Sequence, residues 1–435
     1  MSDDRPSARI LAAWADVSAR SKARPIVRPE RAHVGRPMTA GGGLAAVVAV
    51  AIVAGGFLAV VSVRNDRETT ASPSAPGASS MAAAATPSLV TPSSPSGTLR
   101  PTSDLRAGQL LTAVDGWAIT SVDLLVTHDG GQSWSLAANP APDERLVGAA
   151  FADALHGWVV TDRVPAEGSS GTLRVDVHRT DDGGVTWETS ELLSVRSPGP
   201  DPLVGFPTFS VVSREIAYVE LFAEGAADSE FRLFATLDGG RSWAQRSRIP
   251  LWSIAFVDPS RGWAVRQDTN ALMRTVDGGR SWAGQVLPAI PGFRAADLYP
   301  SVPKLLADGS LVLFEQTAKD GGRGVFLQSV DDGATWTIAA RGPIEGGDAA
   351  AFLDDRTWLL QTGSGLLASN NAGATWETIE TGLPGVIDSI TVVDPRNLSA
   401  IVGIFSNCPP NADCYIPLEL WISRDGGRTW VEATP

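Results

Sequence analysis

The chain has 435 residues, of which 35 are basic and 48 acidic, and its formal net charge is −13. An acidic balance of this size argues against nucleic acid as the partner, because phosphate backbones select basic surfaces. Two cysteines and four scattered histidines are too few for a predicted zinc site, and we expect neither a metal nor a cofactor.

The first 40 residues are predicted to be a cytoplasmic basic tail. Eight Arg and Lys residues face four acidic residues upstream of Leu44. Within this tail, Ile10, Leu11, Trp14 and Val17 fall on one face of a helix. Two interpretations stay open: a short helix that docks on a partner or on lipid, and a weakly ordered tail.

Residues 41–63 are predicted to form a single transmembrane helix. The run from Leu44 to Val63 carries no charge, and 20 such residues span a hydrocarbon core of about 30 Å. The basic tail puts the N-terminus in the cytoplasm by the positive-inside rule. A cleaved signal peptide is the alternative, but its charged segment would be far too long. We therefore expect a single-pass plasma-membrane protein whose C-terminal part lies outside the cytoplasm.

The next segment, residues 64–103, is rich in Ser, Pro, Ala and Thr and has little to bury, so it is predicted to be a disordered linker. A flexible chain of this length reaches roughly 35 Å. The first 64 residues hold nine basic and four acidic residues, which leaves 26 basic and 44 acidic residues in the remainder, a net charge of −18. The part beyond the membrane is therefore strongly acidic.

The remainder of the chain repeats one motif, Ser/Thr-x-Asp-x-Gly-x-Ser/Thr-Trp. Its seven copies are THDGGQSW (127–134), TDDGGVTW (180–187), TLDGGRSW (236–243), TVDGGRSW (275–282), SVDDGATW (329–336), SNNAGATW (369–376) and SRDGGRTW (423–430). The tryptophans are 39 to 56 residues apart, which is the size of one four-stranded unit. The chain is therefore predicted to be a repeat array.

Each copy has the chemistry of a tight turn rather than of a catalytic loop. The carboxylate accepts backbone N–H groups, glycine supplies positive φ, and the tryptophan packs one unit on its neighbour. A turn is needed in every unit, whereas a catalytic acid is needed once. The predicted structural residues are Asp129, Asp182, Asp238, Asp277, Asp331, Asn371 and Asp425, with Trp134, Trp187, Trp243, Trp282, Trp336, Trp376 and Trp430.

Short apolar strands precede each copy, such as HGWVVTD (156–162) and RGWAVRQ (261–267). Each unit is thus predicted to be four antiparallel strands. The predicted fold is an all-β, seven-bladed β-propeller of four-stranded blades over residues 104–435.

The motif SxDxGxTW resembles the Asp box of bacterial neuraminidase repeats. Its pairing with GWAV-like strands resembles the photosystem II assembly and stability factor family of seven-bladed propellers, and more distantly sialidase and sortilin-type propellers. The resemblance to the photosystem II assembly and stability factor family implies a protein-binding module. Such a module would be an assembly or stability factor for a membrane complex and would meet its client through a basic patch. Its partner would be a membrane or envelope protein.

Loop-length variation concentrates on the face opposite the motif turns, and insertions on one face of a repeat array usually mark its binding side. Aligned inner strands place Arg106, Val147, Gly205, Trp252, Asp348 and Asp388 near the channel rim on that face. The predicted binding-face residues are Arg106, Arg163, Arg196, Trp252, Arg266, Arg294, Lys319, Arg323 and Tyr415.

An alternative function is that of a sialidase-like glycosidase or a glycan- or cell-wall-binding propeller. The sialidase resemblance implies a tyrosine nucleophile paired with a glutamate, and Tyr218 with Glu220 is the pair to test. Glycan binding would use aromatics such as Trp252, Phe293 and Tyr415. No residue is predicted to be catalytic.

The two cysteines, Cys408 and Cys414, lie in the loop NCPPNADCYIP with five residues between them. In an oxidising compartment, this spacing predicts a local disulfide that closes the loop.

Overall fold

A computed structural model describes most of the predicted propeller and little of the chain before it. The described residues are 59–60, 105–163, 172–196, 203–205, 207–224, 230–291, 293–294, 298–317, 324–341, 347–362, 365–404 and 417–435. Before residue 105, only β1 (Ala59–Val60) is described, and it pairs in parallel with β11 (Thr208–Val211). The predicted tail and linker, and most of the predicted transmembrane helix, lie outside these residues. Within them, no helix has the length and apolar character to cross a membrane.

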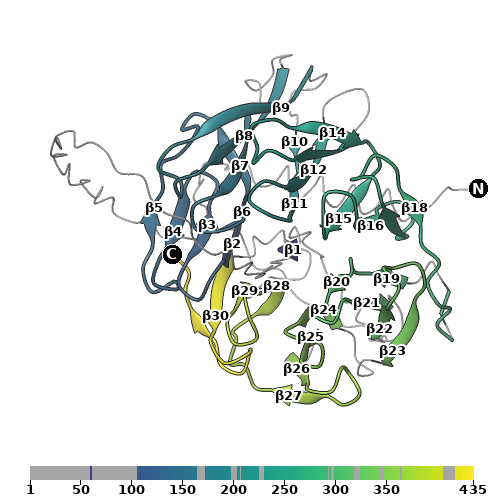
Figure 1. Ribbon diagram of the computed structural model, residues 1–435. Coiled ribbons are helices and arrows are strands. Elements are labelled where there is room, and N and C mark those ends of the chain that lie inside the picture. Colours follow the sequence, from purple (N-terminus) through teal and green to yellow (C-terminus); the bar gives the residue numbers. More distant parts are fainter. Residues whose placement is uncertain are drawn as a thin grey trace, which may run out of the picture. The chain divides into compact units, whose positions relative to one another are not determined.

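From β2 onward the described strands form seven antiparallel sheets, which Figure 1 shows as blades around one centre. Blade 1 comprises β2 (Ala107–Leu110), β3 (Gly116–Ile119), β4 (Leu124–Thr127) and β5 (Ser135–Leu136). Blade 2 comprises β6 (Arg145–Phe151), β7 (Gly157–Arg163), β8 (Thr172–Thr180) and β9 (Glu188–Arg196). Blade 3 comprises β11, β12 (Ala217–Glu224), β13 (Glu230–Thr236) and β14 (Ala244–Ser247), with β10 (Leu203–Val204) beside β12. The seven-bladed, all-β prediction is confirmed.

The other four blades follow the same order from centre to rim. Blades 4 and 5 comprise β15 (Leu251–Phe256), β16 (Gly262–Arg266), β17 (Leu272–Thr275) and β18 (Ala283–Gly284); and β19 (Leu298–Pro300), β20 (Lys304–Leu305), β21 (Leu311–Thr317), β22 (Gly324–Ser329) and β23 (Thr337–Arg341). Blades 6 and 7 comprise β24 (Gly347–Phe352), β25 (Trp358–Thr362), β26 (Gly365–Ser369) and β27 (Glu377–Ile379); and β28 (Val386–Val392), β29 (Leu398–Gly403), β30 (Leu418–Ser423) and β31 (Val431–Glu432).

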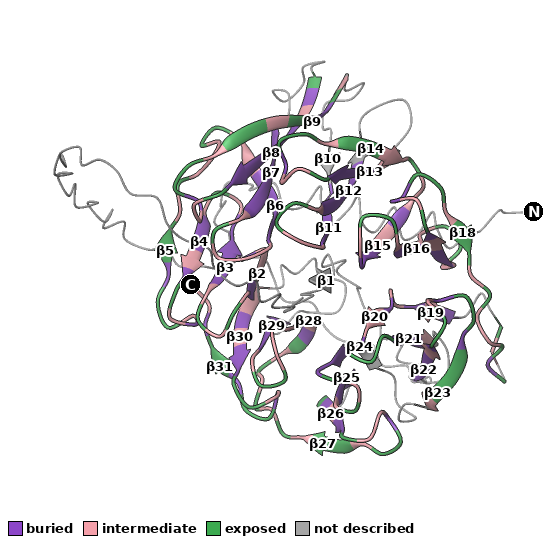
Figure 2. Ribbon diagram, viewed as in Figure 1, coloured by how far each residue is buried: buried purple, intermediate pink, exposed green. Residues whose placement is uncertain are grey.

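A hydrophobic cluster fills every junction between neighbouring blades. Clusters join blades 1 and 2, 2 and 3, 3 and 4, 4 and 5, 5 and 6, and 6 and 7 in turn. Figure 2 shows buried residues along middle strands such as β3 and β25, and exposed residues on outer strands such as β5 and β27. The core is therefore divided into wedges between the sheets, and no blade is stable without its neighbours.

Blades 7 and 1 close the ring by side-to-side packing, because each is a complete four-stranded sheet. The indole N–H of Trp134 donates to the carbonyl of Ala433 at 2.8 Å, and Arg424 donates to the carbonyls of Ala113 and Gly130 at 2.9 and 3.0 Å. Trp134 also packs in a cluster with blade 7. Trp430 itself packs in the cluster between blades 6 and 7, and the contact with blade 1 comes from Arg424 and Ala433 on either side of it in the sequence.

The seven motif copies form turns of one geometry, which we call the box turns (residues 127–134, 180–187, 236–243, 275–282, 329–336, 369–376 and 423–430). In the fourth, Asp277 Oδ1 accepts the N–H of Ser281 at 2.9 Å and Oδ2 accepts its hydroxyl at 2.6 Å, while Thr275 Oγ1 accepts the N–H of Gly279 at 2.9 Å. Burial opposes ionisation, but these hydrogen bonds outweigh it and lower the pKa of Asp277 to about 2. The aspartates therefore hold the turns, as the sequence predicts.

Two further features of the box turns have a structural reason: the second glycine of the motif, and the asparagine that replaces aspartate in the sixth copy. Gly240 has φ +91°, and a Cβ there would lie 2.3 Å from Nε1 of Trp158 in blade 2. Asn371 occupies the aspartate place, accepts the N–H of Thr375 at 2.8 Å and donates to its hydroxyl at 2.8 Å. An amide therefore serves the same turn without a charge.

Replacing Asp277 by alanine is expected to lower the free energy of unfolding by about 1–2 kcal/mol, because the N–H groups it binds lose their acceptor. Asp277→Asn is expected to cost much less, since Asn371 already shows the amide in this role. Urea unfolding of residues 98–435, followed by tryptophan fluorescence, checks both. Equal losses in the two variants would contradict the turn role.

The innermost strands carry β-bulges where the sequence alignment placed the rim residues. Register shifts surround Val147, Trp252 and Asp388 in blades 2, 4 and 7. In blade 3 the equivalent place belongs to Pro207, which precedes Thr208, the partner of Glu220. Gly205, which the alignment placed at the rim, precedes this position by two residues and donates its N–H to the carbonyl of Phe222 in β12 at 2.9 Å.

Candidate functional site

Charged side chains gather where the long strands of blade 2 end on the face opposite the box turns. Arg145 begins β6, Arg163 ends β7, and Arg174 lies near the start of β8. Arg145 stands directly opposite Asp162, and Arg163 directly opposite Arg174. We call Arg145, Arg163 and Arg174 the arginine patch.

Each arginine of the patch is held by a carboxylate. Arg145 Nε donates to Asp162 Oδ1 at 2.9 Å, and its Nη2 contacts the other oxygen of the same carboxylate. Arg163 lies 2.7 Å from Glu144, and Arg174 lies 2.7 Å from Asp176. Charge-assisted pairs of this kind fix the direction of the guanidinium plane.

The acids of these pairs are buried and the arginines are not. The exposed fractions of the Arg145, Arg163 and Arg174 side chains are 32, 60 and 43%, whereas those of Asp162, Glu144 and Asp176 are 0, 6 and 5%. Glu191, 3.5 Å from Arg174, is the one half-exposed acid in this group of described ion pairs. The surface therefore presents positive charge, although the group as a whole is nearly neutral.

Electrostatics keeps the patch charged. Hydrogen bonding to Asp176 raises the pKa of Arg174. Burial raises the pKa of Asp162 more than its hydrogen bond and its attraction to Arg145 lower it, and Arg106 of blade 1 also attracts this carboxylate. The predicted rim residue Arg106 thus acts on the same acid as the patch.

A buried hydrogen-bond chain supports Glu144 from behind. The hydroxyl of Thr161 donates to Glu144 at 2.6 Å and lies 2.8 Å from Nε2 of His178, whose Nδ1 lies 2.8 Å from the hydroxyl of Thr189. Burial lowers the pKa of His178, which favours the neutral ring. Because the Thr161 proton goes to Glu144, His178 is the Nε2–H tautomer.

Among the other predicted binding residues that the structure describes, Arg196 lies in blade 2 with the patch, and the rest lie in or beside other blades. Arg266 ends β16 in blade 4 and pairs with Asp268 at 2.7 Å, and Arg294 is exposed after blade 4. Trp252 is half-buried at its bulge, and Arg196 ends β9 opposite Thr172. Lys319, Arg323 and Tyr415, and the predicted disulfide of Cys408 and Cys414, lie outside the described residues.

Sequence reasoning found Arg163 and missed Arg145 and Arg174. The signal for Arg174 was weak but present, because charged residues alternate with apolar ones in "LRVDV" (173–177) near the start of β8, whereas "ERLV" (144–147) around Arg145 shows no such alternation. The pairing of these two short runs across β7 depends on strand register, which the residue types alone do not give.

The glycosidase candidate pair is not placed for catalysis. Tyr218 is buried, its ring stacks on Phe256 with centroids 3.5 Å apart, and its hydroxyl donates to the carbonyl of Pro259 at 2.8 Å. Burial raises its pKa to about 12 and raises that of Glu220, also buried, well above the ordinary value. Neither side chain is accessible to a sugar ring.

Similarity to known proteins is found among solved structures. Neither protein-family models nor curated proteins give a match. Among solved structures, YCF48 bound to D1 peptide is similar with a TM-score of 0.47 and 17% identity over 75% of this chain and 92% of that chain. YCF48 from Cyanidioschyzon merolae gives 0.42 and 19% over 66% and 84%, and Trypanosoma rangeli sialidase in complex with sialic acid gives 0.34 and 14% over 68% and 56%. At these identities the likeness concerns the propeller fold alone.

Proposed function

We propose that this protein is an extracytoplasmic binding propeller that holds an acidic segment of a protein client on the arginine patch. The observation that carries the proposal is the burial of Glu144, Asp162 and Asp176 behind three exposed guanidinium groups. Because the acids are shielded, an approaching partner meets oriented N–H donors, and carboxylates match that geometry in pairs.

The strand register of blade 2 places two arginines of the patch side by side, which costs stability but suits the recognition of an acidic partner. Arg163 and Arg174 are direct cross-strand neighbours, and like charges so placed destabilise a sheet. Glu144 and Asp176 offset part of this repulsion, and an acidic client would offset more of it. Since the buried acids already fix the side chains, little conformational entropy remains to be lost on binding. We infer that a membrane or envelope protein supplies the carboxylates, as an assembly or stability factor would require.

The location of the propeller outside the cytoplasm is part of the same proposal. The uncharged run from Leu44 to Val63 and the basic tail before it favour a single membrane anchor with the propeller outside the cytoplasm. The linker of residues 64–103 would then let the patch search the membrane surface over roughly 35 Å. A tether of this length raises the local concentration of any client in the same membrane.

Glycan binding or sialidase-like hydrolysis is the alternative that the resemblance leaves. The buried Tyr218 and Glu220 argue against hydrolysis through that pair. Of the aromatic residues named for glycan binding, Trp252 is half-buried at a rim bulge and Phe293 is half-buried against the cluster between blades 4 and 5. We therefore place the protein-client function first.

Site-specific photocrosslinking in native membranes tests this function. A photoreactive residue at Arg163 is expected to trap one membrane or envelope protein, and the same residue at Arg280, exposed on the box turn of blade 4, is expected to trap none. Mass spectrometry identifies the product. Deleting residues 41–63 is expected to release the protein from washed membranes and to reduce the yield.

Trapping of no protein at Arg163, or of the same proteins at Arg163 and Arg280, would contradict the proposal. In that case, sialoside hydrolysis and glycan arrays on the intact chain become the tests of the alternative. A membrane-bound deletion variant would remove the anchor assignment and leave the patch assignment standing.

A further inference from the structure

A groove opens between blades 1 and 2 on the box-turn face, at the end of blade 2 opposite the arginine patch. Its volume is about 580 Å³. The box turns of both blades, β5 and the first turn of blade 2 line it, and its described lining residues include Leu136, Leu155 and Val185 but no lysine or arginine. A volume of this size is typical of ligand-binding clefts.

Large aliphatic side chains from three separate elements are exposed in this groove. Leu136 in β5, Leu155 in the first turn of blade 2 and Val185 in its box turn are 38, 53 and 71% exposed. Single exposed aliphatic residues are normal on a protein surface, but several that converge on one concave site indicate an interaction surface.

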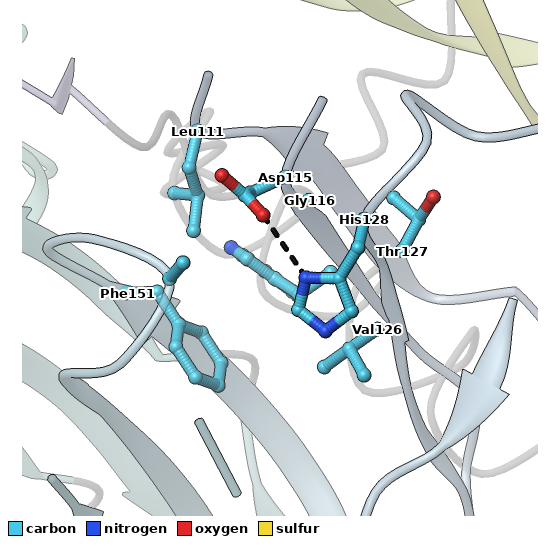
Figure 3. A pocket seen from close by; sticks show the side chains of 9 residues that line it. Leu111, Asp115, Gly116, Val126, Thr127, His128 and Phe151 are labelled. Carbon is cyan, nitrogen blue, oxygen red and sulfur yellow. Dashed lines mark hydrogen bonds and ion pairs between the residues drawn. The ribbon is translucent and has the colours of Figure 1, made fainter. Parts of the chain in front are cut away.

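The side chain of His128, which lines the groove, differs in direction from its counterpart in blade 7. His128 occupies the place in the box turn of blade 1 that Arg424 occupies in blade 7. Arg424 reaches across to blade 1 and donates to the carbonyls of Ala113 and Gly130. His128 instead turns back to Asp115 of its own blade, with Nδ1 3.0 Å from Oδ1 (Figure 3). The two blades are instead joined at Ala138, whose N–H donates to the carbonyl of Gly184 at 3.1 Å.

The polar groups of the groove select a cation. The other oxygen of Asp115 accepts the hydroxyl of Thr112 at 2.9 Å, so the carboxylate is fixed on both sides. Asp182 adds a second carboxylate to the lining. Acceptors thus surround an apolar floor, which is the complement of a lysine or arginine beside an aliphatic residue.

We infer that this groove docks an extended segment of a second protein, one that carries an aliphatic side chain next to a lysine or arginine. The aliphatic side chain packs on Leu155 and Val185, and the cation pairs with the carboxylates of Asp115 and Asp182. The charge of this surface is opposite to that of the arginine patch, so the two ends of blade 2 bind different partners. The inference does not depend on the client of the patch.

Fluorescence anisotropy on the full chain in detergent micelles tests the inference with two labelled peptides, Gly-Ala-Leu-Lys-Leu-Ala-Gly and the same peptide with glutamate in place of lysine. The lysine peptide is expected to bind, and the glutamate peptide is not. Leu155→Asn, Val185→Asn and Asp115→Asn are each expected to weaken binding about tenfold or more. The matched controls are Val276→Asn and Val330→Asn, which change exposed valines in the box turns of blades 4 and 5.

Three results would overturn the inference. They are absence of binding up to about 1 mM lysine peptide, equal binding of both peptides, and an equal loss of affinity in the control variants. Self-association that is lost in Val185→Asn would assign the groove to a second copy of this chain and would also overturn it. Crosslinking from Arg163 is expected to be unchanged in all groove variants, which separates this test from that of the patch.

Discussion

Trp134→Ala is expected to lower the free energy of unfolding of the propeller by about 3–5 kcal/mol, the usual cost of removing a buried tryptophan. Trp134 belongs to blade 1 but packs against Ile401 and Leu420 of blade 7, and its indole donates to Ala433. The variant therefore opens a cavity in the one junction that joins the two ends of the ring. Urea unfolding of residues 98–435 measures the loss.

Trp187→Ala is the matched control, because Trp187 has the same place in the box turn of blade 2 and donates to the carbonyl of Ala138 in blade 1 at 2.7 Å. It is only partly buried, so its loss is expected to be smaller. A chain that ends at Ser423 lacks Arg424, β31 and Ala433, and is expected to lose cooperative unfolding altogether. A sharp transition near the full-length midpoint in that chain would contradict closure by blades 7 and 1.

Raising the pH from about 4.5 to 7 is expected to lower the free energy of unfolding of the propeller. The buried side chain of Glu315 is one cause. Burial raises the pKa of Glu315 to about 7, and one of its oxygens has no hydrogen-bond partner. The folded state therefore holds a proton that the unfolded state has already released, so stability is present at acid pH and is lost as pH rises through the folded pKa. The loss from this group is about 3 kcal/mol.

Glu315→Gln is expected to remove the part of this pH dependence that Glu315 causes, because an amide of the same shape does not ionise. Two further buried acids act in the same direction: burial raises the pKa of Asp388 to about 6 and that of Glu220 well above its usual range. Unfolding in urea at pH 5 and pH 7.5 gives the difference, with Glu377→Gln, an exposed acid, as the control. An unchanged slope in Glu315→Gln would show that Glu315 is ionised in the folded protein.

The repeat units could be predicted from sequence because each unit solves the same local problem. A tight turn needs an acceptor, a residue with positive φ and a hydroxyl, and Asp277, Gly279 and Ser281 supply them with the spacing that the structure shows. The positions of Val147 and Trp252 could also be aligned, since they recur at a constant distance from the following turn, whereas the bulges at these positions were not predicted.

The arginine patch could not be predicted, because its pairs join strands rather than neighbours in sequence. Arg145 and Asp162 are 17 residues apart and meet only through the register of β6 and β7. The burial of Asp162 depends in turn on how closely blade 2 packs. The groove between blades 1 and 2 was missed for a related reason, since the direction of His128 is set by its contact with Asp115 rather than by the repeat pattern.

The most direct test of the central claim is the crosslink yield at a fixed reporter when the charge of the patch is reversed. With the photoreactive residue at Thr172, exposed at the start of β8, the paired change Arg163→Glu and Arg174→Glu is expected to abolish trapping of the client. The paired change Arg241→Glu and Arg280→Glu, on exposed box-turn residues, is expected to leave the yield unchanged. Equal yields in the two double variants would show that the arginine patch does not hold the client.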